Sequence, residues 1–291
     1  MALTLKTNLA DYAVTKAMKD GRVTSDVVTL DYCGPTPAHN GFKAMVRENK
    51  FDAGELAIVT FLQAKAYGKP YVLLPAPISG RFQHHCAGFN IDFGDIRPKD
   101  IEGKRVGVRT YTQTTALWIR GILRHECGVD LDKVTWMTLG DGHLAEYHDP
   151  VNCERLPAGS NIPEMMLKGE LAAALLGEDM PKDPRVRTLV PDAMNAAKDW
   201  FARENVVPIN HMFVVHAELS KKNPEAVREI YRMVKESRAL AEGVPAIFPP
   251  IGMEANRKGI QLAIDWALDQ KIIPRRLSVD ELFDDVTANL G

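Results

Sequence analysis

The stretch FDAGELAIVTFLQAKAYGKPYVLL, residues 51–74, indicates the fold class. Residues 51–56 are expected to form a short strand or turn that leads into an apolar helix over 57–67. A buried strand follows at 71–75, because the sequence YVLL is continuously apolar, as in a strand that is covered on both faces. A strand, a helix and a second buried strand in succession are typical of an α/β protein with largely parallel sheets.

The same alternation continues on both sides of this stretch. Residues 38–49 have helical spacing, with Phe42, Met45 and Val46 on one face. Residues 140–160 are rich in Gly, Asp, His and Pro and are expected to form a long loop. The pattern predicts further strands at 3–7, 27–32, 84–91, 104–108, 134–138, 172–176 and 212–216. It predicts further helices at 10–19, 114–127, 163–169, 223–242, 256–271 and 280–289.

The chain is expected to divide into two lobes. A polar segment with a proline, residues 97–101, is a candidate linker, and a second βα pattern begins after it. We expect residues 1–96 to begin lobe I, residues 97–207 to form lobe II, and residues 208–291 to complete lobe I and add C-terminal helices. Each lobe is expected to be a mostly parallel sheet flanked by helices. The ligand cleft would then lie between the lobes, at strand carboxyl ends and helix N-termini.

Composition and charge exclude several classes of protein. The 291 residues carry 36 basic and 38 acidic side chains, and this balance argues against a strongly basic nucleic-acid binder. No apolar run approaches the ~20 residues that cross a bilayer, and the first residues do not resemble a signal peptide. The four cysteines are widely spaced. We expect a cytoplasmic protein with reduced thiols and with no nucleic-acid or membrane partner.

The common cofactor and hydrolase motifs are missing. The sequence has no GxGxxG after a strand, no P-loop, no GxSxG and no HExxH. Four side chains of the 140–160 loop resemble a loose metal set, but their spacing fits no standard site, and we interpret them as solvated loop residues. They are Asp141, His143, His148 and Asp149. We therefore expect no cofactor and no metal.

Two histidines are candidates for proton transfer. His84 stands beside His85 at the start of a predicted strand, and only one of the two can face the cleft because side chains alternate across a strand. Either could equally be a structural residue beside Cys86. His211 lies where the chain is expected to cross back between the lobes. Its ordinary pKa of about 6.5 suits proton transfer near neutral pH, and the alternative is a hinge hydrogen bond.

An anion site is predicted at the N-terminus of the 114–127 helix. Free amides and hydroxyls at a helix N-terminus can bind a carboxylate, although plain N-capping by threonine is the alternative. Arg109 ends the preceding strand and, like Arg81, is a candidate for a charged contact with an acid. The residues at the helix start are Tyr111, Thr112, Gln113 and Thr114.

Three more charged residues stand out. Glu55 follows a glycine on a turn between apolar runs, where it is either the N-cap of the next helix or, less expectedly, an acid in the cleft. Glu254 and Arg257 are three residues apart near a helix start and can pair with each other. We suspect that they also reach the cleft or a subunit contact.

The C-terminal region resembles a known family. The sequences GMEANRK at 252–258 and PRRLSVDELF at 274–283 are similar to the C-terminus of the 4,5-dihydroxyphthalate decarboxylase family. Phe51-Asp52 with Glu55-Leu56, residues 107–123, and Pro208-Ile209 with His211 are similar as well. This family resembles the type 2 periplasmic binding proteins in fold, reused as a cytoplasmic enzyme.

The resemblance implies an activity and roles for residues. The expected activity is non-oxidative, cofactor-independent decarboxylation of a hydroxylated aromatic carboxylic acid by a homo-oligomer. His84 and His211 would act as acid and base in unknown order, with Glu55 among the catalytic residues. Residues 112–114 with Arg81 or Arg109 would hold the substrate's second acid group.

Two departures from the family pattern concern the substrate. Ala57 stands where the family tends to place a serine, and Glu178-Asp179 stands where the decarboxylase has Pro-Arg. An arginine replaced by two carboxylates would weaken the binding of a dianionic acid, so the same family is better supported than the same substrate. Two alternatives stay open: a solute-binding protein for a small carboxylate, and a metal-assisted lyase. The second would use Glu55, His84, His85 or His211.

Overall fold

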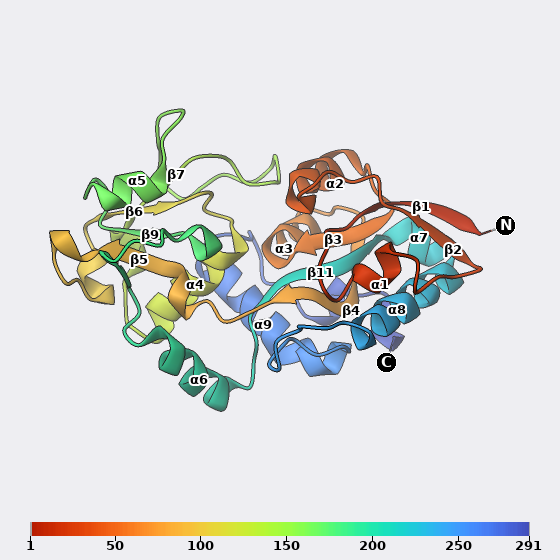
Figure 1. Ribbon diagram of the computed structural model, residues 1–291. Helices are drawn as coiled ribbons and strands as arrows, with labels where there is room; N and C mark the ends of the chain where they lie inside the picture. Colours follow the sequence, from red (N-terminus) through yellow and green to blue (C-terminus); the bar gives the residue numbers. More distant parts are fainter. Residues whose placement is uncertain (1, 291) are drawn as a thin grey trace.

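The computed structural model describes residues 2–290 and consists of two lobes, each built on one sheet (Figure 1). In lobe I the strand order is β2-β1-β3-β11-β4. Strands β1, β2 and β3 run parallel, whereas β11 is antiparallel to both β3 and β4. The bounds are β1 Leu3–Asn8, β2 Val28–Asp31, β3 Ala53–Ala57, β4 Tyr71–Gly80 and β11 Ile209–His216.

Lobe II contains the second sheet, in the order β10-β5-β9-β6-β7-β8. Its strands β9, β6, β7 and β8 are parallel, while β5 and β10 are antiparallel additions at one edge. The bounds are β5 Ala87–Asn90, β6 Arg105–Val108, β7 Thr135–Thr138, β8 Cys153–Arg155, β9 Ala173–Leu175 and β10 Val186–Thr188. The predicted α/β class with two lobes is confirmed.

Helices flank both sheets. Lobe I carries α1 Lys16–Lys19, α2 Phe42–Glu48, α3 Ile58–Ala66, α7 Ala217–Lys222 and α8 Pro224–Ala239. Lobe II carries α4 Thr114–His125, α5 Ile162–Leu167 and α6 Ala193–Glu204. Short 3₁₀ helices are η1 Ala38–Gly41, η2 His84–Cys86, η3 Ile91–Phe93, η4 Pro98–Ile101, η5 Leu131–Lys133, η6 Gly177–Asp179, η7 Asp280–Leu282 and η8 Thr287–Asn289. Within residues 2–290, no helix combines the length and apolar composition needed to cross a membrane.

Helix α9, Met253–Asp269, packs against α3 of lobe I and α4 of lobe II. Trp266 of α9 meets Trp118 of α4 edge-on, with ring centroids 5.4 Å apart. Gly121 makes this contact possible, because a Cβ atom there would lie 1.9 Å from Cε3 of Trp266. The side chain of Trp118 is fully buried.

The chain crosses between the lobes at two adjacent segments. The first crossing follows β4, because β5 already belongs to the second sheet, so the change of sheet comes earlier than the linker expected at 97–101. The second crossing leads from α6 into β11, close to the expected return near 207. The two are joined by hydrogen bonds from Arg81 N to Pro208 O (3.0 Å) and from Gln83 Nε2 to Asn210 Oδ1 (2.8 Å).

Four predicted elements need correction. The loop predicted at 140–160 contains β8, which pairs with β7. The helix predicted at 280–289 consists of two 3₁₀ turns, because the Asp284 carboxylate accepts hydrogen bonds from the amides of Val286 and Thr287 and closes a local turn. Only Lys16–Lys19 of the helix predicted at 10–19 is helical, since the Thr15 hydroxyl forms a competing turn with Ala10 O and Tyr12 N. The strand predicted at 84–91 begins as the 3₁₀ turn η2.

Candidate active site

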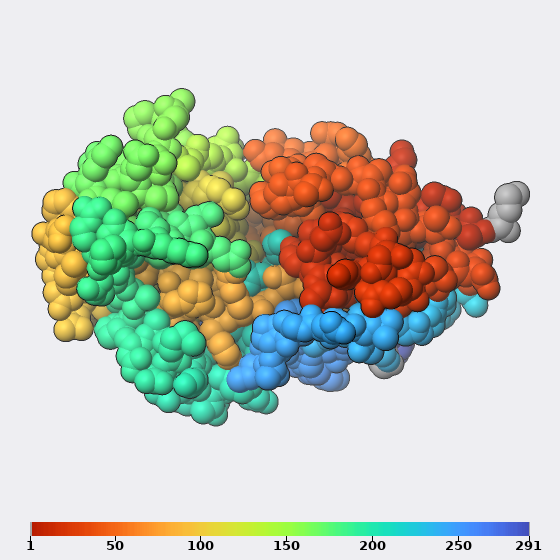
Figure 2. Space-filling model, viewed as in Figure 1, coloured from red at the N-terminus to blue at the C-terminus, as the bar shows by residue number. Residues whose placement is uncertain are grey.

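A cavity of about 450 Å³ lies between the lobes, where Figure 2 shows the surface hollowed. Lobe I contributes η1, the start of α2, the β3–α3 junction and the start of β11. Lobe II contributes the end of β6, the N-terminus of α4 and part of the loop after β7. The lining residues are His39, Asn40, Phe42, Lys43, Ala57, Thr60, Arg109, Thr110, Thr112, Gln113, Thr114, Thr115, Gly140, Asp141, His143, Asn210 and His211.

A buried carboxylate holds one imidazole at the wall of this pocket. His211 Nδ1 lies 2.6 Å from Glu55 Oε2, and the Glu55 side chain is fully buried. The other oxygen, Oε1, accepts the backbone N–H of Ala10 at 2.7 Å. Because Glu55 acts as the acceptor, Nδ1 of His211 carries the proton, and Nε2 on the far side of the ring is left free to accept one. This arrangement is typical of a histidine that works as a general base.

Tyr12 completes the group around Glu55. Its hydroxyl donates to Glu55 Oε2 at 3.1 Å and lies 3.2 Å from His211 Nδ1. Burial, and then the charge of Glu55, raise the pKa of Tyr12 far above its usual value, so the hydroxyl stays protonated and remains a donor. Tyr12 was not among the predicted site residues, because a lone tyrosine before a short helix carries no motif.

The strand register explains why Glu55 and His211 meet. Glu55 of β3 is paired with Phe213 of β11, so His211, two residues earlier on β11, lies on the same face as a diagonal neighbour. Gly54 lets β1 and β3 come close just before Glu55, since its φ is +145° and a Cβ atom there would lie 2.2 Å from Asn8 O. The N-cap alternative for Glu55 is wrong: Ala57 is the N-cap of α3, and Glu55 lies within β3.

Two cations on opposite lobes face the pocket without an ion-pair partner. Arg109 follows β6 of lobe II, and Lys43 lies in α2 of lobe I. Among the described residues, neither side chain forms a salt bridge or a hydrogen bond. Arg109, which was predicted to contact an acid, therefore lines the site. Lys43 was not predicted, because a single lysine on an amphipathic helix is expected to face solvent.

The N-terminus of α4 also opens into the pocket. The backbone amides of Thr114 and Thr115 precede the first intrahelical bond, which Leu117 N donates to Gln113 O at 2.9 Å. No threonine side chain caps this helix. Gln113 Oε1 is buried and has no hydrogen-bond partner among the described residues. Thr112, Gln113 and Thr114 all line the pocket, as an anion site at this helix start requires.

Two further imidazoles line the pocket, and sequence reasoning missed both. His143 was interpreted as a solvated loop residue, but it is half-buried, with Nδ1 2.7 Å from the Thr60 hydroxyl. Burial, with the nearby cations, lowers the pKa of His143 to about 4. Burial and Arg109 also lower the pKa of His39. The unusual length of the 140–160 loop was the available signal, since long loops in compact domains often carry function.

His84 does not share the pocket with His211, so the predicted pair of facing imidazoles is wrong. His84 lies in η2, is 1% exposed, and packs its ring against Trp200 of α6 at 5.9 Å between centroids. Neither ring nitrogen has a hydrogen-bond partner among residues 2–290. Burial lowers the pKa of His84 to about 4, so the ring is neutral near neutral pH. His84 is therefore a buried structural residue beside Cys86, which was the alternative interpretation of the sequence.

Tyr111 and Arg81 also lie outside the pocket lining. Tyr111 is buried, and its hydroxyl donates to Gln270 O at 3.1 Å. The guanidinium carbon of Arg120 lies over the Tyr111 ring, 3.7 Å from the ring centroid. The Tyr111 side chain supports the start of α4 from the core and does not face the cleft. Arg81 forms an ion pair with Glu178, one of the two carboxylates at the departure from the family pattern.

Glu254 and Arg257 are not among the residues that line the pocket, and they pair with each other at 2.6 Å near the start of α9. Arg257 also binds Asp280 at 2.8 Å. Both ion pairs are exposed, so the expectation that these residues reach the cleft is wrong, while the alternative of a subunit contact stays a prediction. The simpler prediction, a local pair three residues apart, is confirmed.

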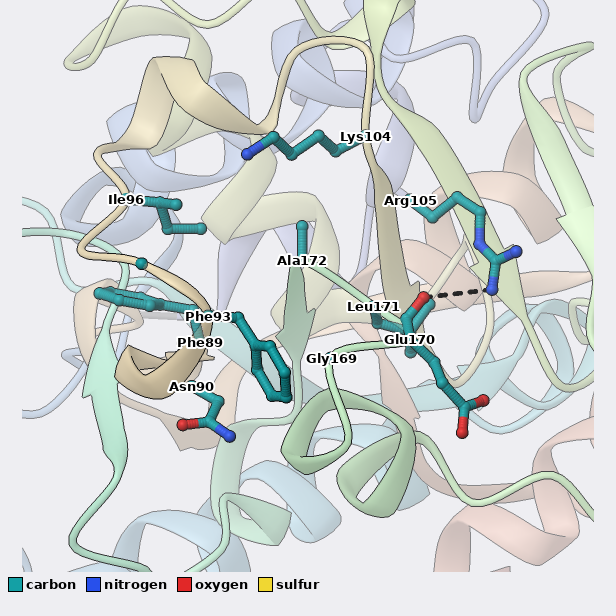
Figure 3. A pocket seen from close by; sticks show the side chains of 11 residues that line it. Phe89, Asn90, Phe93, Ile96, Lys104, Arg105, Gly169, Glu170, Leu171 and Ala172 are labelled. Atoms are coloured by element: carbon teal, nitrogen blue, oxygen red, sulfur yellow. Dashed lines mark hydrogen bonds between the residues drawn. The ribbon is translucent and has the colours of Figure 1, made fainter.

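A second cavity, of about 420 Å³, lies in lobe II near the starts of β6 and β9 and holds none of the predicted site residues (Figure 3). Its charged side chains are Lys104, Arg105 and Glu170, and Arg105 donates to the carbonyl oxygen of Glu170 at 3.1 Å. It has no histidine for proton transfer. In the part of the chain that the structure describes, no three His, Cys, Asp or Glu side chains form a group able to hold a metal ion.

Two curated proteins are similar to most of the chain, although no protein-family model matches it. The 4,5-dihydroxyphthalate decarboxylase of Comamonas testosteroni is 27% identical over 258 residues, which cover 82% of this chain and 76% of the relative. The 4,5-dihydroxyphthalate decarboxylase of Pseudomonas putida is 29% identical over 212 residues, which cover 68% of this chain and 81% of the relative.

Solved structures support the fold. The periplasmic aliphatic sulphonate binding protein SsuA from Escherichia coli aligns with a TM-score of 0.59 and 12% identity over 98% of this chain and 93% of that one. The desulfurization enzyme DSZB aligns with a TM-score of 0.56 and 14% identity over 99% and 98% of the two chains. The resemblance found in the sequence is thus confirmed: the chain is similar over most of its length to two 4,5-dihydroxyphthalate decarboxylases, and it has the two-lobe periplasmic-binding-protein-like fold.

Proposed function

We propose that the protein is a cofactor-independent decarboxylase of a hydroxylated aromatic dicarboxylate similar to 4,5-dihydroxyphthalate. The main support is the interlobe pocket, in which an imidazole held by a buried carboxylate faces two cations that lack ion-pair partners among the described residues. The names of the two curated relatives supply the reaction class. We also propose a cytoplasmic location and a homo-oligomeric state.

Substrate binding would use the cations and the free amides of α4. Arg109 can grip one carboxylate with two parallel hydrogen bonds, and Lys43 on the other lobe can reach a second. The amides of Thr114 and Thr115 add neutral donors to the same anion site. Fixing both acid groups orients the aromatic ring toward the base. This orientation lowers the barrier because the reacting groups are already in place.

His211 is the base of the proposed reaction. In 4,5-dihydroxyphthalate each hydroxyl lies para to a carboxylate. His211 Nε2 takes the hydroxyl proton, the oxygen becomes a carbonyl, and electron density moves to the para carbon, which accepts a proton. The bond from that carbon to the carboxylate then breaks, its electron pair restores the aromatic ring, and CO₂ leaves. The imidazolium, stabilised by Glu55, returns its proton to the oxygen.

Two residues bear on the exact substrate. Ala57, at the position where the family tends to have a serine, is part of the pocket lining, so this wall offers no hydroxyl. Arg81 forms an ion pair with Glu178, so Arg109 and Lys43 are the cations that can bind the substrate. We therefore propose the class of hydroxylated aromatic dicarboxylates and not one named acid.

The test is release of CO₂ from 4,5-dihydroxyphthalate by the purified protein and by His211→Asn. Activity is expected in the wild type and a loss of roughly 10²–10⁴-fold in the variant. Phthalate, which lacks the hydroxyls, should bind without releasing CO₂. Binding of both acids without any release would replace the proposal by the alternative, a solute-binding protein of the kind seen among the structural neighbours.

A further inference from the structure

His143 has no part in the steps above, yet the reaction needs a second proton-transfer group. The hydroxyl that loses its proton and the carbon that gains one lie at opposite ends of the ring, so His211 cannot serve both. We propose that His143 delivers the proton to the carbon that loses CO₂, and that it takes up this proton when a dicarboxylate binds. The proposal deepens the proposed function and rests on it.

The two imidazoles contact the same aromatic ring. Phe42 contacts His211 with centroids 5.4 Å apart and His143 with centroids 5.6 Å apart, edge-on in both cases. Both histidines line the same cavity. A substrate ring seated along Phe42 therefore lies near both imidazoles, so that a different group can serve each of the two para-related proton transfers.

His143 belongs to lobe II but is held by lobe I. The strap, residues 140–147 between β7 and β8, reaches across to α2 and α3 (Figure 1). Arg47 Nε donates to the carbonyl oxygen of His143 at 2.6 Å, and Lys69 Nζ binds Glu146 Oε1 at 2.6 Å. With Thr60 beside Nδ1, these contacts fix the ring at the cavity wall. The imidazole is thus in place only while the strap is docked.

Positive charges surround His143 before a substrate binds. Lys43 and Arg47 face it from α2 and Arg109 from the end of β6, while the titratable ring of His39 faces it from η1. Together with burial they keep the ring neutral, with its pKa lowered to about 4. The two carboxylates of a bound substrate neutralise Lys43 and Arg109 and add negative charge nearby, which favours a protonated imidazole.

Proton uptake also fits the stoichiometry. Decarboxylation of an aromatic carboxylate consumes one proton for each CO₂ released, since hydrogen replaces the carboxylate on the ring. An imidazole that is protonated when the substrate binds brings this proton into the pocket before the C–C bond breaks. His39 is the competing donor, but among the described residues no hydrogen bond fixes its ring.

The experiment is a calorimetric titration with phthalate near neutral pH, repeated in buffers of different ionisation enthalpy. Phthalate carries both carboxylates but cannot react. We expect uptake of close to one proton per phthalate by the wild type, loss of this uptake in His143→Gln, and retention in His39→Gln. With 4,5-dihydroxyphthalate, His143→Gln should lower kcat roughly 10²–10⁴-fold and change KM far less.

Several results would overturn the proposal. They are unchanged proton uptake in His143→Gln, a kcat within about tenfold of the wild type, or no binding of phthalate. If His143→Gln does not fold, Arg47→Gln tests the same point by releasing the strap, and it should lower both proton uptake and kcat. A wild type that takes up the proton but releases no CO₂ would refute the proposed function and with it the proton delivery to carbon. CO₂ release by the wild type together with unchanged proton uptake in His143→Gln would refute the proposal for His143 alone, so the two failures are distinguishable.

Discussion

Glu55 decides which nitrogen of His211 faces the substrate, although it does not line the pocket itself. We predict that Glu55→Gln lowers kcat by roughly 10²–10⁴-fold, because the amide can present its NH₂ group to Nδ1 and turn the wrong nitrogen toward the pocket. Steady-state kinetics measures this change. Glu254→Gln, an exposed carboxylate, is the matched control. Unchanged kcat in Glu55→Gln would remove Glu55 from the mechanism.

His84 is predicted to be dispensable for activity. His84→Leu should keep kcat within a few-fold of the wild type, since the ring packs on Trp200 outside the pocket and both its nitrogens lack partners in the described structure. The same kinetic assay checks this, with His211→Asn as the contrast. A loss as large as that of His211→Asn would show that His84 takes part after all.

The same variant should change stability at acid pH. The pKa of His84 is lowered to about 4 in the folded protein, against about 6.5 when unfolded, so the unfolded chain binds the proton first and stability falls as pH drops through this window. Relative to the wild type, His84→Leu should gain up to about 3 kcal/mol at pH 4. Urea unfolding at several pH values measures it. His143 titrates in the same range, so some acid sensitivity remains.

Single residues also show where sequence reasoning stops. His211, Arg109 and the start of α4 were predictable from the family resemblance, the end of a strand and a helix terminus, whereas Glu55 was expected first as an N-cap and lies within β3. His84 was misplaced because the alternation rule was applied to a strand that begins as a 3₁₀ turn. His143 gave no local sign of its role, since a loop residue acquires one only through contacts with a distant helix.

At the scale of elements, the packing of α9 on α4 depends on Gly121. We predict that Gly121→Ala destabilises the protein by about 1–3 kcal/mol or more, because the new methyl group would overlap the Trp266 indole, itself held in the core. Denaturant unfolding measures the change. Gly140→Ala is the control for stability, since its nearest neighbour would lie 4.0 Å away. Equal stability of the two variants would contradict the packing argument.

The strap is the second element with a testable role. Its Lys69–Glu146 ion pair is partly exposed and outside the pocket lining, so it is expected to contribute only about 0.2–1 kcal/mol to docking. Lys69→Ala and Glu146→Ala should each raise KM a few-fold, and the double variant should be no worse than either one. A double-mutant cycle on KM measures this. Additive effects would show that the two residues act independently.

Elements with strong periodicity were predictable, whereas elements closed by side-chain turns were not. The β3–α3–β4 unit has the expected order because its apolar residues follow the spacing of buried strands and a helix. Residues 280–289 were expected to be helical, but the Asp284 carboxylate bonds to nearby amides and replaces helical hydrogen bonds. Such competition depends on geometry that apolar spacing does not record.

For the whole molecule, the two-lobe arrangement brings the base and the cations of the site together from different lobes. Arg109 and His143 come from lobe II, and Lys43, Glu55 and His211 come from lobe I, so the site exists only where the lobes meet. The α/β alternation and the family resemblance predicted this arrangement. The position of the first crossing was harder to predict, because β5 joins the second sheet before the polar segment that reads as a linker.

The central claim is that His211, held by Glu55, is the base of a decarboxylation in the interlobe pocket. The most direct measurement is CO₂ release from 4,5-dihydroxyphthalate by His211→Ala, with and without added imidazole. The account predicts a loss of roughly 10²–10⁴-fold that free imidazole partly restores, because it supplies the missing proton acceptor. Full turnover by His211→Ala without imidazole would contradict the account.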